Sequence, residues 1–156
     1  MISRWNTGRD RVERLLDAGR IERVSPDRAP AELMLTQATA HLESARMLAA
    51  SDVVGAYQLA YDAARKALAA LLANQGLRAK GLGGHAVLYD VARAQLDPPL
   101  GEVLRPFDWM RRLRNTTEYP DTDKPVAAAA DLAEAIPAAL AVVNAIRAVI
   151  EDMPAY

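Results

Sequence analysis

A run of arginines and polar residues at positions 111–119 (RRLRNTTEY) concentrates side chains that could bind a phosphate group. On an ideal helix, with about 100° per residue, the apolar face consists of Trp109, Met110, Leu113, Thr116 and Thr117. Arg111, Arg112 and Arg114 fall outside that face, and a guanidinium group matches phosphate oxygens in geometry and charge. The same spacing is typical of a solvated helix face with ion pairs such as Arg114–Glu118. Both interpretations of the run stay open.

The segment from Arg114 to Pro120 (RNTTEYP) resembles the signature of HEPN domains, in which an arginine and a following polar residue precede a histidine. The alanine-rich run at positions 56–68 (AYQLAYDAARKAL) is similar to a bundle helix of that family. The sequence GLGGH, which ends at His85, is similar to the family's loop between two helices. The order and spacing of these parts extend the resemblance over about residues 30–150.

The resemblance implies a role for each residue of the motif. Arg114 would hold the scissile phosphate of an RNA, and Asn115 would orient that arginine. Tyr119 stands where the family has its histidine, with four residues between it and Arg114. Tyrosine has an unperturbed pKa of about 10, so Tyr119 is suited to donate a hydrogen bond or a proton and is a poor base near neutral pH.

Further residues are expected to contact the substrate: Arg111, Arg112, Asp62 and Glu118. The resemblance implies that the helix carrying Asp62 lies beside the motif, where its carboxylate could pair with Arg114. His85, which follows two glycines at the start of an expected helix, has two interpretations. It is either a cap of that helix or a substitute for the catalytic histidine that the motif lacks.

HEPN domains commonly dimerise and bring their two motifs together at the interface, and the active members cleave RNA without metal. The resemblance therefore implies a toxin-like homodimer that binds RNA or a nucleotide, with endoribonuclease activity left open by Tyr119. A second interpretation is a non-catalytic interaction module, or a toxin–antitoxin component whose partner is a nucleotidyltransferase or an antitoxin. A third is a helical bundle of regulator type that binds a small molecule in an apolar cavity.

The composition excludes several kinds of site. The chain of 156 residues has no cysteine and two histidines, which excludes disulfides, thiolate metal sites and a cysteine nucleophile. We expect no metal and no cofactor. The formal net charge of -1 provides no global field for nucleic acid, so RNA would need a local basic patch.

Two segments bear on localisation. The first ten residues, MISRWNTGRD, lack the apolar core of a secretory signal. The apolar stretch at positions 126–150 contains charged residues and a proline, which predicts a buried core helix rather than a membrane span. We therefore expect a cytoplasmic protein with no membrane partner.

The elements that must position these residues are all predicted to be helical, because alanine is common and β-branched runs are rare. We predict an all-α, antiparallel up-and-down bundle of about four to five main helices plus a short N-terminal helix. Residues 1–29 are assigned to the N-terminal helix and its connector, and residues 30–156 to the bundle. Caps, glycines and prolines place the helices at about 7–18, 30–50, 52–75, 85–95, 100–119 with an interruption at Pro106, and 125–151 with a bend near Pro137.

Overall fold

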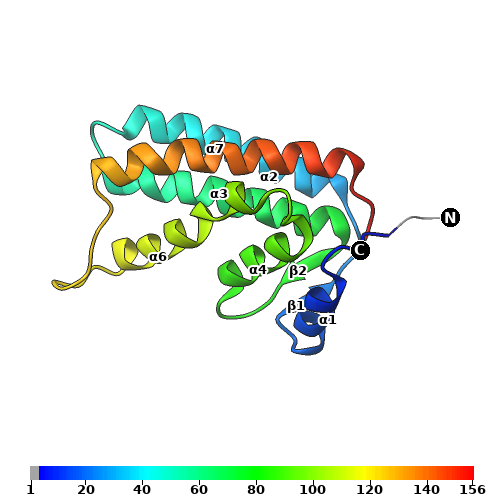
Figure 1. Ribbon diagram of the computed structural model, residues 1–156. Coiled ribbons are helices and arrows are strands. Elements are labelled where there is room, and N and C mark those ends of the chain that lie inside the picture. The colour runs from blue at the N-terminus through cyan, green and yellow to red at the C-terminus, as the bar shows by residue number, and fades with distance from the viewer. Residues whose placement is uncertain (1–3) are drawn as a thin grey trace.

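Three long helices, α2 (Arg28–Leu48), α3 (Val53–Gln75) and α7 (Ala129–Asp152), lie side by side and form the body of the protein (Figure 1). The computed structural model describes residues 4–156. α3 is the central helix, because it packs against both of the other long helices and against the shorter ones. Its side chains at Ala56 and Ala60 are fully buried and small, which lets the neighbouring backbones approach closely.

The shorter helices α4 (Gly84–Leu96) and α6 (Pro106–Glu118) pack on the remaining side of α3 (Figure 1). The single-turn helix α5 (Gly101–Leu104) lies between them in the sequence and contacts α4, α6 and α7. Pro106 separates α5 from α6, as predicted, because proline fits the first turn of a helix but cannot continue one. The buried side chains of α6 are Phe107, Met110, Leu113 and Thr117. The all-α class and the helical bundle are confirmed.

A small antiparallel sheet joins the N-terminal segment to this bundle. β1 (Ile21–Arg23), which follows α1 (Arg9–Asp17), pairs with β2 (Leu77–Ala79). The expectation that the chain has no strand was wrong here, because strands of three residues are too short to show an alternating pattern. Gly76 turns the chain from α3 into β2 with a φ of +85°. The sheet thereby fixes the start of the loop that leads to α4.

Some helix starts differ from the predicted ones. α1 begins at Arg9, slightly later than predicted, and its N-cap residue Gly8 provides no side-chain cap. α2 begins slightly earlier than predicted, because the Asp27 carboxylate accepts a hydrogen bond from the backbone N–H of Ala29 at 3.0 Å. The division of the chain after residue 29 stays a prediction. Residues 1–3 of the predicted N-terminal part lie outside the described residues.

Helix α7 begins later than predicted and continues through Pro137 as one helix. Residues 125–128 before it are not helical, and the Thr117 hydroxyl accepts a hydrogen bond there from the backbone N–H of Ala127 at 2.9 Å. By length and composition alone α7 could cross a membrane. Its apolar stripe, which includes Leu132 and Ile146, is nevertheless buried within the bundle, as in a core helix.

Candidate functional site

Two arginines of α6 and the glycine-rich loop before α4 line a pocket of about 320 Å³. The lining residues of this arginine pocket are Gly81, Leu82, Gly83, Gly84, His85, Ala86, Arg111, Arg114 and Asn115. Gly81 and Gly83 adopt positive φ, which lets the loop turn sharply into α4. The first turn of α4 has no side-chain cap and opens onto the pocket. The partial positive charge of a helix N-terminus therefore adds to that of the guanidinium groups.

Arg114 is held in place by three neighbours. Its guanidinium forms the predicted ion pair with Glu118 and donates a hydrogen bond to the Asn115 side chain at 3.5 Å. It also lies over the ring of Tyr61, 5.7 Å from the ring centre, in a cation–π contact. The side chain stays 23% exposed, while its buried Nε–H has no hydrogen-bond partner within residues 4–156. Arg114 is thus oriented by the protein but retains unused donor capacity.

Arg111 and Arg112 are neighbours in sequence but lie in different surroundings. Both pair with Asp108, at 3.0 Å and 2.7 Å respectively. Arg111 is 23% exposed and lines the arginine pocket, and its buried Nε–H lacks a partner in the described part of the chain. Arg112 is 73% exposed and is not part of the pocket lining. Of these two predicted ligands, the structure brings Arg111 together with Arg114.

His85 reaches the arginine pocket from the second position of α4. Its Nδ1 lies 2.8 Å from the hydroxyl oxygen of Tyr61, a residue of α3 that is 2% exposed. The Tyr61 ring stacks on Phe107, with 5.5 Å between the ring centres and an interplanar angle of 18°. The interpretation of His85 as a helix cap is wrong, because Gly83 is the N-cap residue and the imidazole is bonded to Tyr61.

The protonation states of this pair follow from its surroundings. Burial lowers the pKa of His85 below its usual value of 6.5, and the positive charges of Arg65 and Arg114 act in the same direction. The carboxylate of Asp62 opposes the lowering of the His85 pKa without cancelling it. Burial raises the pKa of Tyr61 to about 12, although the nearby arginines oppose the shift. At neutral pH the imidazole is therefore neutral and the hydroxyl keeps its proton.

Asp62 lies in a neighbouring pocket and forms no ion pair with Arg114 in the described structure. This side pocket has a volume of about 230 Å³, and its lining residues are Gln58, Leu59, Tyr61, Asp62, Arg65, His85 and Arg114. Asp62 pairs with Arg65 and also lies 3.4 Å from Lys66 and 3.3 Å from His41. Burial opposes ionisation, but the hydrogen bond to Arg65 and the nearby positive charges lower the pKa of Asp62. The expected pair with Arg114 is replaced by this network, because those cations are closer.

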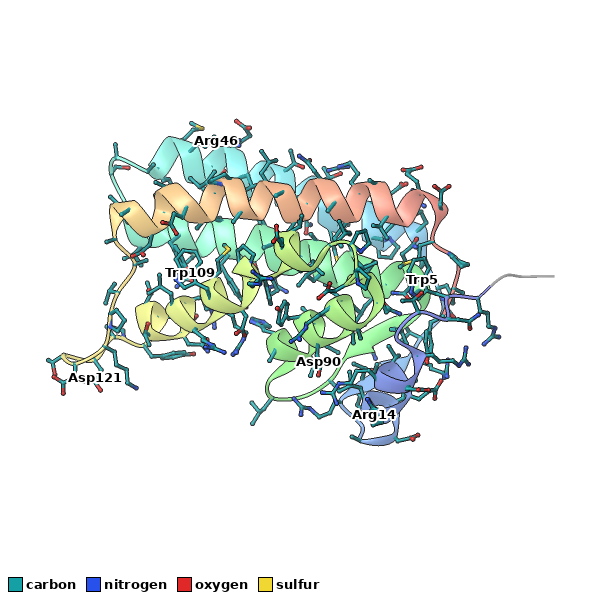
Figure 2. The ribbon with its side chains drawn as sticks, in the orientation of Figure 1. Trp5, Arg14, Arg46, Asp90, Trp109 and Asp121 are labelled. Atoms are coloured by element: carbon teal, nitrogen blue, oxygen red, sulfur yellow. The ribbon has the colours of Figure 1, made fainter. Side chains whose placement is uncertain are left out.

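Tyr119 is the C-cap residue that follows α6, and it belongs to the lining of neither pocket. Its side chain is 72% exposed, and its backbone N–H donates to the carbonyl oxygen of Asn115 at 3.2 Å. The loop that follows, which carries Asp121, extends away from the helices (Figure 2). Tyr119 is thus separated from the pocket to which Arg114 and Asn115 contribute.

A third hollow, of about 480 Å³, adjoins the arginine pocket at His85. Its apolar wall residues include Met34, Ala69, Leu72, Leu77 and Leu88. A cavity of this size and character is what the interpretation as a small-molecule-binding bundle requires. The sequence gives no signal of it, because its walls come from separate helices and from the sheet.

The sequence pattern also fails to reveal Tyr61 as part of the site. An aromatic residue on an alanine-rich helix is typical of the core, and the Tyr61 ring is indeed buried there. Its polar role depends on the contact with His85, which lies in another helix. Two features of the sequence could have indicated the contact. One is a histidine that follows two glycines, and the other is a tyrosine whose hydroxyl needs a hydrogen-bond partner once its ring is buried.

A family model described as HEPN domain matches residues 31–150, which is most of the chain. The matched region contains the arginine pocket, the side pocket and the Tyr61–His85 contact. Comparisons with curated proteins and with solved structures find no match.

Proposed function

Because the chain belongs to the HEPN domain family, we propose that it is a toxin-like homodimer that binds RNA or a nucleotide through the arginine pocket. The observation that carries the proposal is the convergence of four side chains with donor groups on one pocket: Arg111, Arg114, Asn115 and His85. Phosphate oxygens are strong acceptors, and arginine forks bind them with favourable geometry.

The electrostatics of the pocket support this assignment. The chain as a whole has a net charge of -1, so any attraction for RNA must be local. The carboxylates of Asp108 and Glu118 hold Arg111 and Arg114 in position. Each guanidinium has five N–H donors, so an ion pair with one carboxylate leaves donors for a phosphate. The pocket is therefore preorganised for an anion, and its arginines retain donor capacity.

Cleavage of RNA would extend the same binding. In that reaction the ribose 2′-hydroxyl gives its proton to a base and its oxygen forms a bond to phosphorus, while the bond from phosphorus to the 5′-oxygen breaks and that oxygen takes a proton from an acid. Arg111 and Arg114 would stabilise the charge that develops on the phosphate oxygens. Tyr119 is exposed and has the chemistry of an acid rather than of a base. We therefore propose phosphate binding as the primary property and metal-independent cleavage as its catalytic extension.

Binding of a labelled single-stranded RNA tests the primary property. We expect Arg114→Ala to weaken binding by roughly tenfold or more, because hydrogen bonds to charged groups contribute about 1.5–3 kcal/mol. Arg46→Ala is the matched control, since Arg46 is an exposed arginine on α2, on the far side of the body from α6 (Figure 2). Equal affinity of the parent and the Arg114 variant would contradict the proposal.

Cleavage and dimerisation are measured on the same preparations. Product formation in the presence of a metal chelator, lost in Arg114→Ala and kept in Arg46→Ala, would establish a ribonuclease. RNA binding without product would leave a binding protein whose motif has lost its base. Sedimentation at micromolar concentration tests the homodimer, and a monomer there would contradict a site shared between subunits.

One observation favours the second candidate function, a non-catalytic module or a toxin–antitoxin component. The ion pair between Arg114 and Glu118 is the arrangement that such a module needs, since it neutralises the charge of the motif arginine within the chain. A nucleotidyltransferase or an antitoxin would then be the partner. Failure of the parent protein to bind RNA, with dimerisation intact, would favour this candidate over the first.

A further inference from the structure

We infer that His85, held by Tyr61, supplies the imidazole of the arginine pocket and donates its Nε2–H to a phosphate oxygen bound there. The inference rests on the proposed phosphate binding and deepens it, because it adds a ligand that the motif at positions 114–119 does not contain. Tyr61 is assigned as the positioning residue.

Hydrogen-bond partners determine which imidazole nitrogen carries the proton. Within residues 4–156 the hydroxyl of Tyr61 has one partner, Nδ1 of His85, at 2.8 Å. The tyrosine is 2% exposed, and a buried hydroxyl proton that lacks an acceptor is costly. If Nδ1 carried a proton and donated it to the tyrosine, the hydroxyl proton would have no acceptor. The hydroxyl therefore donates to Nδ1, which places the proton of the neutral imidazole on Nε2.

Packing around Tyr61 fixes the position of its hydroxyl. The ring is stacked on Phe107 from α6 and is covered by the Arg114 guanidinium at 5.7 Å. Three helices meet at this point, because Tyr61 belongs to α3, Phe107 and Arg114 to α6, and His85 to α4. The orientation of the imidazole is thus set by the bundle core and not by the exposed loop before α4.

The position of His85 leaves its second imidazole nitrogen, Nε2, available to contact a bound phosphate. His85 lines the arginine pocket together with Arg111 and Arg114, and its Nε2 has no hydrogen-bond partner in the described part of the chain. A phosphate in this pocket would meet two guanidinium groups and one neutral N–H donor. In this tautomer the imidazole donates a hydrogen bond at neutral pH without carrying a charge. It can therefore contact a phosphate oxygen without adding to the repulsion between the two arginines.

Titration of the parent protein with inorganic phosphate, followed by nitrogen NMR of the imidazoles, tests the inference directly. Before phosphate is added, we expect Nδ1 of His85 to have the signal of an unprotonated nitrogen and Nε2 that of a protonated one. Phosphate should shift the Nε2 signal of His85 in the parent and leave it unchanged in Arg114→Ala. His41→Gln assigns the signals, because the chain has two histidines.

Affinities for phosphate separate a ligand from a structural residue. We expect His85→Ala to lose roughly tenfold in affinity, the effect of one hydrogen bond to a charged group. His85→Gln, which keeps an N–H donor, should recover part of that loss. Tyr61→Phe should lose about twofold to tenfold, because the Nε2–H tautomer is then only partly populated. Tyr89→Phe is its matched control, since Tyr89 also packs near Phe107.

The outcomes distinguish this inference from the proposed function. Phosphate binding that depends on Arg114, with unchanged affinity in His85→Ala and no shift of its Nε2 signal, would overturn the inference and leave the proposed function intact. An Nδ1-protonated imidazole in the parent would also overturn it. Absence of phosphate binding in the parent would overturn both.

Discussion

Under the proposed function, Glu118 and the bound phosphate compete for the guanidinium group of Arg114. In the structure it pairs with Glu118, and in the proposed complex it binds a phosphate. The glutamate orients the arginine when the pocket is empty, but its charge also repels an incoming phosphate. The balance between these two effects sets the affinity of the pocket.

Replacing Glu118 by glutamine should shift that balance toward the ligand. The pair is partly exposed, with 23% and 36% of the two side chains accessible, and such pairs contribute about 0.2–1 kcal/mol. We expect Glu118→Gln to raise affinity for labelled RNA by about one- to fivefold. Glu43→Gln, which breaks a comparable pair with Arg46 on α2, should leave RNA affinity unchanged. Weaker binding in the Glu118 variant would show that orientation, and not repulsion, dominates.

The sequence predicts which residues of α6 belong to the site better than it predicts which side chains contact one another there. The arginines outside the apolar face of α6 and the pair between Arg114 and Glu118 follow from helical spacing. The contact between Tyr61 and His85 does not follow, because it joins two helices whose relative placement depends on packing. For the same reason the pair between Asp62 and Arg114 that the family resemblance implied is absent from the described structure, where Asp62 pairs with Arg65.

At the scale of elements, the pocket depends on how α4 and α6 are held against α3. The hydroxyl of Tyr57 on α3 donates to the backbone carbonyl of Met110 on α6 at 2.9 Å. On the α4 side, β2 holds the loop that carries the pocket glycines. The turn at Gly76 connects α3 to β2, so its geometry decides where that loop begins.

Gly76→Ala should therefore destabilise the protein. A Cβ at this position would lie 2.7 Å from the carbonyl oxygen of Val24, and the φ of +85° disfavours any side chain. We expect the free energy of unfolding in urea to fall by about 2–3 kcal/mol. Gly19→Ala is the control, because its φ is +69° but a Cβ there would meet no described atom within 4 Å. A loss of about 1 kcal/mol is expected for the control, and equal losses would contradict the role of the close contact.

Long helices could be predicted from the sequence, and the small sheet could not. The periodic apolar residues of α2 and the cap of α3 at Asp52 are local signals. Pro106 likewise locates the break between α5 and α6. The pairing of β1 with β2 joins residues that are far apart in the sequence, and no local pattern in three residues specifies it.

At the scale of the whole molecule, protonation of the two histidines makes the free energy of unfolding depend on pH. Burial is the largest cause that lowers the pKa of His41 and of His85, followed by the charges of Lys66 and Arg65 respectively. The unfolded chain therefore binds protons at these positions more readily than the folded protein. The free energy of unfolding should fall as the pH drops below the unfolded pKa of about 6.5, and it should be insensitive to these groups above that value.

Thermal unfolding at several pH values measures this dependence. We expect a lower melting temperature at about pH 5.5 than at about pH 7.5. The double variant His41→Gln/His85→Gln should show a smaller difference between these two conditions. A parent protein that is equally stable at both would show that the two imidazoles are protonated as easily in the folded state as in the unfolded state.

The pairing of β1 with β2 has a consequence for the order in which the protein folds. The two strands enclose the whole of α2 and α3, so their pairing closes a long loop. Closure costs less chain entropy once α2 and α3 have packed through contacts that are closer in sequence. We therefore expect the α2–α3 hairpin to form early and the sheet late in folding. The loop before α4 follows the sheet, so the arginine pocket would be completed in one of the last steps of folding.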